Sequence, residues 1–274
     1  MKIHHLNCGS FCPLSHPIVN RALPQLDRFN LVCHCLLIES ESGLILVDTG
    51  LGLQDVRNYH RLGINFTFNQ MAKPKLDLEE TAYLQITKMG HNPKDVKHII
   101  VSHFDSDHIG GLADFPEAKI HILEDEWLAA QNPTSPREKA RYKKIRWEQN
   151  RSIKTYKTDG DLWQGFHRVQ NLEGIDQSIY FVALPGHTKG HAGVFIENKE
   201  QLFFAGDSYM IKNQLENGKT SFPISLYNKM AHEDESKAEE TLKKLKLIHD
   251  SQTEINIFSS HDREQYMSFL KVAK

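Results

Sequence analysis

The sequence predicts an α+β fold with a two-layered β core and helices on the outside. Apolar runs of strand length are separated by turn residues, and they come in two batches, each followed by a helical pattern. This order favours two packed sheets covered by helices. No Pro-, Gly- or Ser-rich linker divides the 274 residues, and the length is ample for one large core. We therefore expect a single domain spanning 1–274.

The first batch of strands begins with a hairpin at 31–50. The runs LVCHCLLIES and GLILVDTG are apolar and β-rich, and they flank a turn at ESG. Residues 77–90 predict a helix, because Asp77 can cap its start with Glu80 three residues on, and Gly90 fits just past its end. VKHIIVS predicts a strand that ends at SHFDSDHIGG, and AKIHIL predicts the next strand.

The second batch follows a helical pattern at 124–150 that is broken at NPTSP. DQSIYFVALPGH, GHAGVFIEN and QLFFAGD predict three strands with tight connections, 234–249 predicts a helix, and TEINIFSSHD predicts a final strand. The stretch at about 124–165 is expected to be a basic helical insertion. Its part at 137–157 carries nine basic residues against Glu138 and Glu148, which favours a solvated helix face or a basic rim near a site.

Composition narrows the function classes. The formal net charge is −2, so the chain as a whole does not have the balance of a nucleic-acid binder. Four cysteines in a chain of this length indicate reduced thiols rather than a disulfide framework, and alternation along a strand puts Cys33 and Cys35 on the face opposite His34. There is no apolar run of signal-peptide length at the start and no apolar stretch long enough to span a membrane. A cytoplasmic location is the default expectation.

Side chains that bind metals follow four of the predicted strands. A single histidine or aspartate after a strand usually caps a turn, but strand ends can aim several side chains into one cleft. Imidazole nitrogen and carboxylate oxygen suit zinc, and also iron or manganese. Taken in chain order, the strand-end residues are His103, Asp105, Asp107 and His108, then His187, then Asp207, and then His261.

The order of these motifs resembles the metallo-β-lactamase fold superfamily. Its signature loop is H-x-H-x-D-H followed by Gly-Gly, and its later motifs are a Gly-His, an Asp after a strand and a His near the C-terminus. The resemblance runs from the hairpin at 31–50 to His261 and includes LVDTG at 46–50 and PGHTKGH at 185–191. Within the superfamily the chain is similar to the lactonase-like metallohydrolases. The resemblance implies an αββα sandwich of two mixed sheets flanked by helices, with a two-metal site at the sheet edge.

The resemblance also implies roles for individual residues. One metal would be held by His103, Asp105 and His187, the second by Asp107, His108 and His261, and Asp207 would bridge both. Two divalent ions are implied, zinc first, with iron or manganese as alternatives. His191 and Asp48 are expected to support the ligands by hydrogen bonds.

The implied activity is that of a binuclear metallohydrolase, in which a metal-bridging hydroxide cleaves an ester, lactone or thioester of a small molecule. Asp107 could also pass a proton, and Tyr209 could donate a hydrogen bond to a developing oxyanion. In the lactonase-like relatives a tyrosine follows the bridging aspartate by three positions, whereas Tyr209 follows Asp207 by two.

Asp105 departs from the family pattern, which has histidine there. A carboxylate is a harder ligand than imidazole, so it moves metal preference toward iron or manganese. Counting two divalent metals, three carboxylates and a bridging hydroxide, the site is formally neutral, whereas histidine at 105 would leave a charge of +1. We expect a less acidic bound water, and with it either a neutral ester- or lactone-like substrate or an oxidised metal centre.

Two alternatives to hydrolysis stay open. One is an iron-dependent redox enzyme for oxygen or sulfur chemistry on the same fold, and the other, with only the basic segment in its favour, is a nuclease. The expected partner is a small-molecule substrate, with no membrane and no nucleic acid, and a homodimer is left open.

Overall fold

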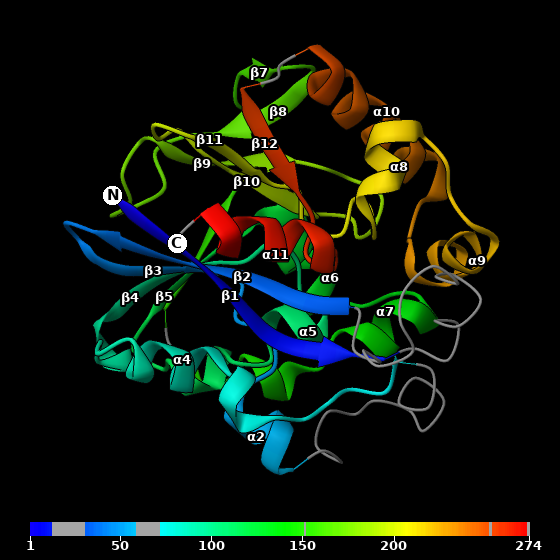
Figure 1. The fold of residues 1–274 in the computed structure, drawn as a ribbon. Helices are drawn as coiled ribbons and strands as arrows, with labels where there is room; N and C mark the ends of the chain where they lie inside the picture. The colour runs from blue at the N-terminus through cyan, green and yellow to red at the C-terminus, as the bar shows by residue number, and fades with distance from the viewer. Residues whose placement is uncertain (13–30, 59–71, 151, 252–253, 273–274) are drawn as a thin grey trace.

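The computed structural model describes the chain except residues 13–30, 59–71, 151, 252–253 and 273–274. Two six-stranded sheets pack face to face, and helices cover their outer sides (Figure 1). Both sheets mix parallel and antiparallel pairs, as the predicted αββα sandwich requires. The fold class predicted from the sequence is therefore confirmed.

The first sheet has the strand order β1-β2-β3-β4-β5-β6. The hairpin expected at 31–50 is present as β2 and β3, and β4 and β5 follow at the two runs predicted after it. Strand β1 was not predicted, because a register shift between Asn7 and Ser10 interrupts its pairing with β2 and blurs the alternation. The bounds are β1 Lys2–Phe11, β2 Leu31–Ser40, β3 Gly43–Val47, β4 Val96–Ile100, β5 Lys119–Leu123 and β6 Ile153–Tyr156.

The second sheet has the order β12-β11-β10-β9-β8-β7. The three strands predicted with tight connections are β9, β10 and β11, and the predicted last strand is β12, which pairs with β11 in parallel. The bounds are β7 Leu162–Trp163, β8 Phe166–Val169, β9 Ile179–Ala183, β10 Ala192–Ile196, β11 Gln201–Phe204 and β12 Ile255–Phe258.

The helices lie on the outer sides of the sheets and at their edges (Figure 1). The α-helices are α2 Leu53–Arg57, α4 Ala82–Lys88, α5 Ser106–Ile109, α6 Glu124–Gln131, α7 Pro136–Arg141, α8 Lys212–Asn217, α9 Phe222–Ala231, α10 Glu235–Ser251 and α11 Arg263–Val272. Short 3₁₀ turns are η2 Leu78–Glu80, η3 Pro93–Asp95, η4 Leu112–Asp114 and η5 Lys144–Arg146.

Two expected helical segments differ in detail. The helix expected at 77–90 is split into η2 and α4, because Thr81 takes an extended conformation and starts a new helix by accepting a hydrogen bond from Leu84 N–H. The stretch at 124–165 holds α6, α7 and η5, but it also contributes β6 to the first sheet and β7 to the second.

Three apolar clusters account for the layers. Alternate residues of the strands meet between the sheets, for example Ile38 of β2 and Phe181 of β9. The other face of the first sheet packs under α4 through Ile86, and the other face of the second packs under α10 through Leu245. These four side chains are fully buried, so the layers form where alternate strand residues meet the apolar stripes of the helices.

The four cysteines are free, and three of them are buried. Cys33 and Cys35 join the cluster beneath the helices of the first sheet, whereas His34 turns to the opposite face and contacts Phe258. This confirms the expected facing of the CHC run. None of the described helices is long and apolar enough to cross a membrane.

Candidate metal centre

Backbone hydrogen bonds bring the four strand ends to one edge of the sandwich. Ser260 N–H donates to Gly206 O (3.0 Å), which aligns the ends of the parallel strands β12 and β11. Ala192 N–H donates to Ser102 O (3.0 Å), and His34 N–H donates to Ser260 O (2.8 Å), so the two sheets are joined at the same point. Side chains that follow these strands therefore face one another across a small volume.

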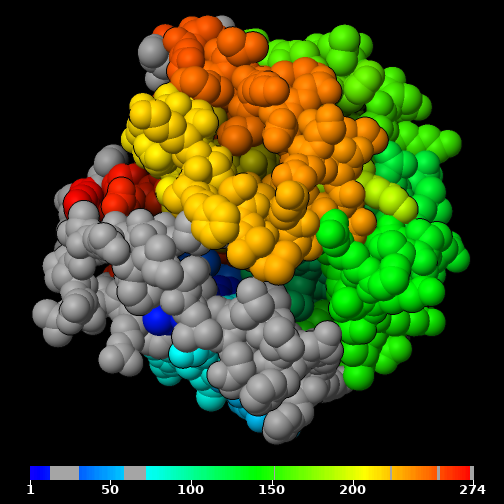
Figure 2. Space-filling model, turned by 90° about the vertical axis from the view of Figure 1, so that its right-hand side faces the viewer, coloured from blue at the N-terminus to red at the C-terminus, as the bar shows by residue number. Residues whose placement is uncertain are grey.

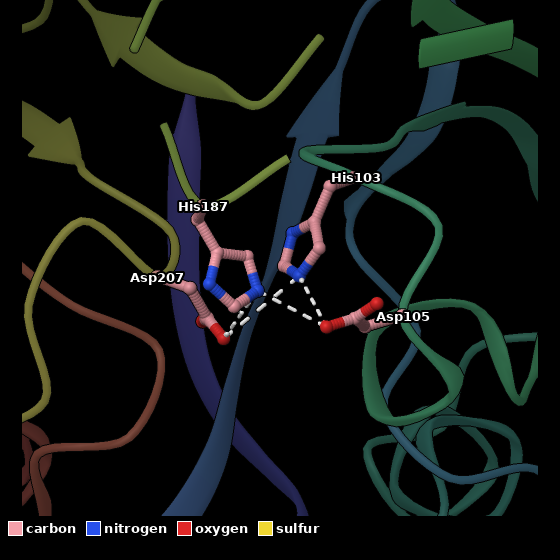
Figure 3. A group of neighbouring side chains, drawn as sticks. All are labelled: His103, Asp105, His187 and Asp207. Carbon is pink, nitrogen blue, oxygen red and sulfur yellow. Dashed lines mark hydrogen bonds and ion pairs between the residues drawn. The ribbon is translucent and has the colours of Figure 1, made fainter. Parts of the chain in front are cut away.

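The first group of candidate ligands is drawn in Figure 3. His187 Nε2 lies 3.0 Å from Asp105 Oδ2 and 3.5 Å from Asp207 Oδ2. His103 Nε2 lies 3.5 Å from Asp105 Oδ2 and 3.8 Å from Asp207 Oδ2. The four ligand atoms lie within 4.8 Å of one another, and the side chains point to a common centre from three different loops.

The second group adjoins the first at Asp207. His108 Nε2 lies 3.2 Å from Asp207 Oδ1, and His261 Nε2 lies 3.2 Å from Asp207 Oδ2. His261 Nε2 also lies 3.6 Å from Asp107 Oδ2, and Cys33 adds a buried thiol beside that pair. The structure thus brings together all seven candidate ligands, and Asp207 touches both groups.

Each of the four histidines uses Nδ1 for support and turns Nε2 to the centre. His103 Nδ1 contacts Ser102 Oγ (3.0 Å), and His261 Nδ1 donates to Val32 O (2.8 Å). His108 Nδ1 donates to Asp48 Oδ2 (2.8 Å), while His187 Nδ1 lies 3.2 Å from Nδ1 of His232. Such partners fix ring orientation and tautomer in metal sites.

The donor set fits divalent metal ions. His103 Nε2, His108 Nε2 and Asp207 Oδ1 are buried and make no hydrogen bond with the described residues. Buried polar atoms without partners are costly in a folded protein, and here three of them converge. Imidazole and carboxylate donors in two adjoining groups are the chemistry that would hold two such ions.

The charges in the cluster stabilise one another. Burial opposes ionisation of Asp207, but the nearby charges of His261 and His108 hold its pKa well below its ordinary value. Conversely, burial lowers the pKa of His261, and Asp207 overcomes this and raises it to about 9. The carboxylate at the centre is therefore an anion that attracts cations.

The expected supporting roles of Asp48 and His191 are present. Asp48 Oδ1 accepts from Ser102 N–H (2.8 Å) and Oδ2 accepts from Ser102 Oγ (2.6 Å), in addition to His108. His191 Nδ1 donates to Leu184 O (2.8 Å), and its Nε2 accepts from the backbone N–H of Asp207 (2.9 Å). Both side chains fix ligands without facing the centre.

The glycines after the signature loop are needed for close packing rather than for a turn. Gly110 has a φ of −56°, which any residue can adopt. A side chain there would meet Asp55 Oδ2 and the carbonyl of Gly50. Gly50 follows Asp48 by two positions. The close approach of Gly110 to Gly50 therefore packs the loop that carries His103 to His108 against the segment that carries Asp48.

Tyr209 differs from its expected role. Its ring belongs to the apolar cluster under α10, and its hydroxyl donates toward Gln265 Oε1 (3.2 Å) and Ile257 O (3.3 Å). Both partners lie on the outer side of the second sheet, so the side chain of Tyr209 packs there. Tyr209 follows Asp207 by two positions instead of three, and its hydroxyl has its partners in this layer and not among the ligands.

The sequence did not point to two other residues at the site. Burial, followed by the negative charges of Asp207, Asp107 and Asp105, raises the pKa of Tyr227 in α9 well above its ordinary value, so this hydroxyl is within the electrostatic reach of the cluster. Arg141, the last residue of α7, places Nε 3.0 Å from Asp105 Oδ1. Arg141 lies in a charge-rich helix and Tyr227 in an amphipathic one. Neither belongs to a sequence motif that would have identified it as a site residue.

Glu126 of α6 joins two ligand loops from behind. Its Oε1 accepts from Phe104 N–H (2.9 Å) and Tyr142 Oη (3.1 Å), and its Oε2 accepts from Gly190 N–H (3.2 Å). Burial raises the pKa of Glu126, and Thr188 and the N–H of Phe104 work against that effect. The loop of His103 and the loop of His187 are thus tied to one carboxyl group.

The cluster has an opening to solvent. Among its members, the side chains of Asp105 and Asp107 are 19% and 17% exposed, whereas those of the four histidines and Asp207 are at most 4% exposed. Figure 2 shows a hollow between the yellow-orange atoms of the segment that contains α9 and the green atoms, with dark blue atoms of N-terminal residues visible deep inside it. Asp105 and Asp107 are therefore the members of the cluster that solvent reaches.

Known proteins are similar to this chain in sequence. A probable metallo-hydrolase of Mycobacterium tuberculosis is 36% identical over 219 residues, which is 79% of this chain and 65% of that protein. The chain thus spans about two thirds of the length of that relative. An N-acyl homoserine lactonase of Bacillus thuringiensis is 30% identical over 269 residues, covering 97% of this chain and 95% of the relative.

A similar fold has been solved. The structure of an N-acyl homoserine lactone hydrolase, with the product N-hexanoyl-L-homoserine bound at its catalytic metal center, matches with a TM-score of 0.71 and 28% identity. The match covers 97% of this chain and 95% of the other. Residues 28–251 also match the family description of the metallo-beta-lactamase superfamily. With two sheets, two adjoining ligand groups and these matches in agreement, the chain belongs to the metallo-beta-lactamase superfamily.

Proposed function

We propose that this protein is a two-metal hydrolase that opens the ring of a small lactone. The observation that supports it most directly is the sharing of Asp207 between two groups of metal-type ligands. A carboxylate with both oxygens engaged suits two ions held a few ångströms apart. The similarity to lactonases over nearly the whole chain supports a lactone as substrate.

In this proposal each ligand group holds one divalent ion, zinc in the first instance. When bound, the two ions would lower the pKa of a water molecule and polarise the substrate carbonyl. The first would be held by His103, Asp105 and His187, the second by Asp107, His108 and His261, and both by Asp207. The histidines are suited to this because each has Nδ1 engaged by a supporting group and turns Nε2 toward the carboxylates that would share the metals.

Two further side chains, those of Asp107 and Tyr227, would act on the substrate. Asp107 lies at the opening, so its carboxylate would take a proton from the attacking water and return it to the leaving alkoxide. Tyr227 would donate its hydroxyl proton in a hydrogen bond to a substrate oxygen. Its raised pKa keeps that proton in place at neutral pH.

The proposal is tested by metal analysis and a substrate panel. Protein purified without added metal is analysed for zinc, iron and manganese, and is then assayed on N-acyl homoserine lactones, simple lactones, nitrophenyl esters and thioesters. We expect two zinc ions per chain and a preference for lactones, with activity lost in Asp207→Asn. Iron with visible absorbance and no hydrolysis of any of these compounds would instead support the redox alternative.

A further inference from the structure

Asp105 stands where the family's signature loop has histidine, and its two oxygens have different neighbours. Oδ2 lies 3.0 Å from His187 Nε2 and 3.5 Å from His103 Nε2, inside the first ligand group. Oδ1 lies 3.0 Å from Nε of Arg141. One oxygen of this carboxylate therefore faces the ligands, and the other faces a cation (Figure 3 shows the carboxylate beside the two imidazoles).

Arg141 is itself held in place by other parts of the chain. Its side chain is 7% exposed, and its Nη1 donates to the carbonyl of His187 (3.0 Å). Its Nη2 donates to the carbonyl of Ala231, the last residue of α9. The planar guanidinium thus spans α7, the ligand loop of His187 and α9, and it cannot follow Asp105 into another orientation without breaking these bonds.

The ion pair changes the charge of the site. The Nε atom of Arg141 lies 3.0 Å from Asp105 Oδ1, so a largely buried guanidinium faces this carboxylate directly. The positive charge of Arg141 cancels the formal charge of this carboxylate. The charge count made from the sequence did not include Arg141. With Arg141 included, the site regains the +1 that histidine at 105 would give. Breaking such a buried pair leaves the remaining charge without a partner.

We propose that Arg141 is a positioning residue that makes Asp105 a single-oxygen ligand without net charge, so that the pair Asp105–Arg141 replaces the histidine of the family's signature loop. The inference rests on the metal-binding part of the proposed function. It gives a role to Arg141, one residue of the basic segment at 137–157. It concerns the metal position rather than the substrate.

A double-mutant cycle on Zn²⁺ affinity tests the proposal. The affinity is measured by competition with a chromophoric chelator for the native protein, Asp105→His, Arg141→Gln and the double variant. In the native background Asp105→His leaves a buried cation beside the metal, so we expect affinity to fall by on the order of tenfold or more. In the Arg141→Gln background, Asp105→His should lower the Zn²⁺ affinity by less than about threefold, because no cation remains beside the metal.

Two further variants separate positioning from general stability. Arg141→Lys keeps the cation, so Asp105→His should be as damaging in this background as in the native one. Arg137→Gln is the matched control, because Arg137 also bonds two carbonyls at the C-terminal end of α9, those of Lys229 and of His232 just after the helix, and no ion pair joins it to Asp105. It should leave the cycle unchanged. Unfolding in the presence of chelator shows whether each variant is folded, and Arg141→Lys carries the test if Arg141→Gln is not.

The pH–rate profile gives a second readout. Arg141→Gln removes a positive charge beside the metals, so the acidic limb of kcat/KM should move to higher pH, and the double variant should return it toward the native position. An equal cost of Asp105→His in both backgrounds overturns the inference even if lactones are hydrolysed. Conversely, a non-additive Zn²⁺ cycle in a protein that cleaves no lactone refutes the proposed substrate and leaves this inference standing.

Discussion

Asp48 Oδ2 lies 2.8 Å from Nδ1 of His108, and the two residues come from different strand ends of the first sheet. Asp48 has a φ of 55°, a left-handed conformation that few non-glycine residues adopt. The strained backbone turns its carboxylate toward Ser102 and His108 together. The pair shows that the candidate centre is fixed as much by residues behind the ligands as by the ligands.

The first prediction concerns this support. Asp48→Asn should weaken Zn²⁺ binding by about 10- to 100-fold, because the amide cannot hold the His108 ring with a negative charge. Chelator competition measures the affinity, and Asp176→Asn, which changes an exposed aspartate outside both ligand groups, is the control. Equal affinities of the two variants would contradict a supporting role for Asp48.

The second prediction concerns the shared ligand. Asp207→Asn keeps the shape of the side chain but removes the charge that both groups use. We expect the bound metal to fall below two ions per chain and kcat/KM to fall by at least about 10²-fold. Metal content and steady-state kinetics are measured on the same preparation. Full metal content with normal kinetics would remove Asp207 from the centre.

The third prediction separates the two tyrosines. Tyr227→Phe removes a hydroxyl beside the cluster and should lower kcat/KM by about 10²-fold with little change in stability. Tyr209→Phe removes the bonds to Gln265 and Ile257, so it should cost about 1 kcal/mol of stability and leave kcat/KM unchanged. Kinetics and urea unfolding of both variants decide the matter. The reverse pattern would restore Tyr209 as the catalytic tyrosine.

The fourth prediction is a loss of stability in mild acid, from histidines outside the centre. Burial, followed by the charge of His4, lowers the pKa of His5 from 6.5 to about 4, and burial followed by the charge of His98 lowers the pKa of His121 from 6.5 to about 3. The unfolded chain therefore binds protons at higher pH than the folded one. The stabilisation is fully present above pH 6.5 and is lost as the pH falls toward 4.

Urea unfolding between pH 7 and pH 4, with chelator present, measures this effect. His121 bonds His98 Nδ1 (2.9 Å) and Tyr156 Oη (2.7 Å), and His121→Gln keeps a donor and an acceptor there without a titrating ring. It should reduce the slope of stability against pH by up to about 1.4 kcal/mol per pH unit. The exposed His167→Gln is the control, and an unchanged slope in His121→Gln would exclude His121 as a source of the effect.

Much of the fold could be predicted because its signals are local. The period-two alternation in 31–50 and the turn between its two runs define β2 and β3, and the helical stripe in 234–249 defines α10. Strand β6 was missed within a charged stretch that reads as helical. It is a strand because it pairs with β5, a contact that the local pattern does not encode.

The sequence by itself determined which residues could bind metal and in which order the strand ends present them, from His103 to His261. That information is local, since a ligand side chain directly after an apolar run lies at a sheet edge whatever the packing elsewhere. The tertiary structure alone decided which partners those ligands meet. Arg141 against Asp105 and Tyr227 beside the carboxylates depend on how α7 and α9 pack over the sheet edge. Such contacts arise only when the whole chain is folded, because residues distant in sequence carry no shared periodicity that would pair them.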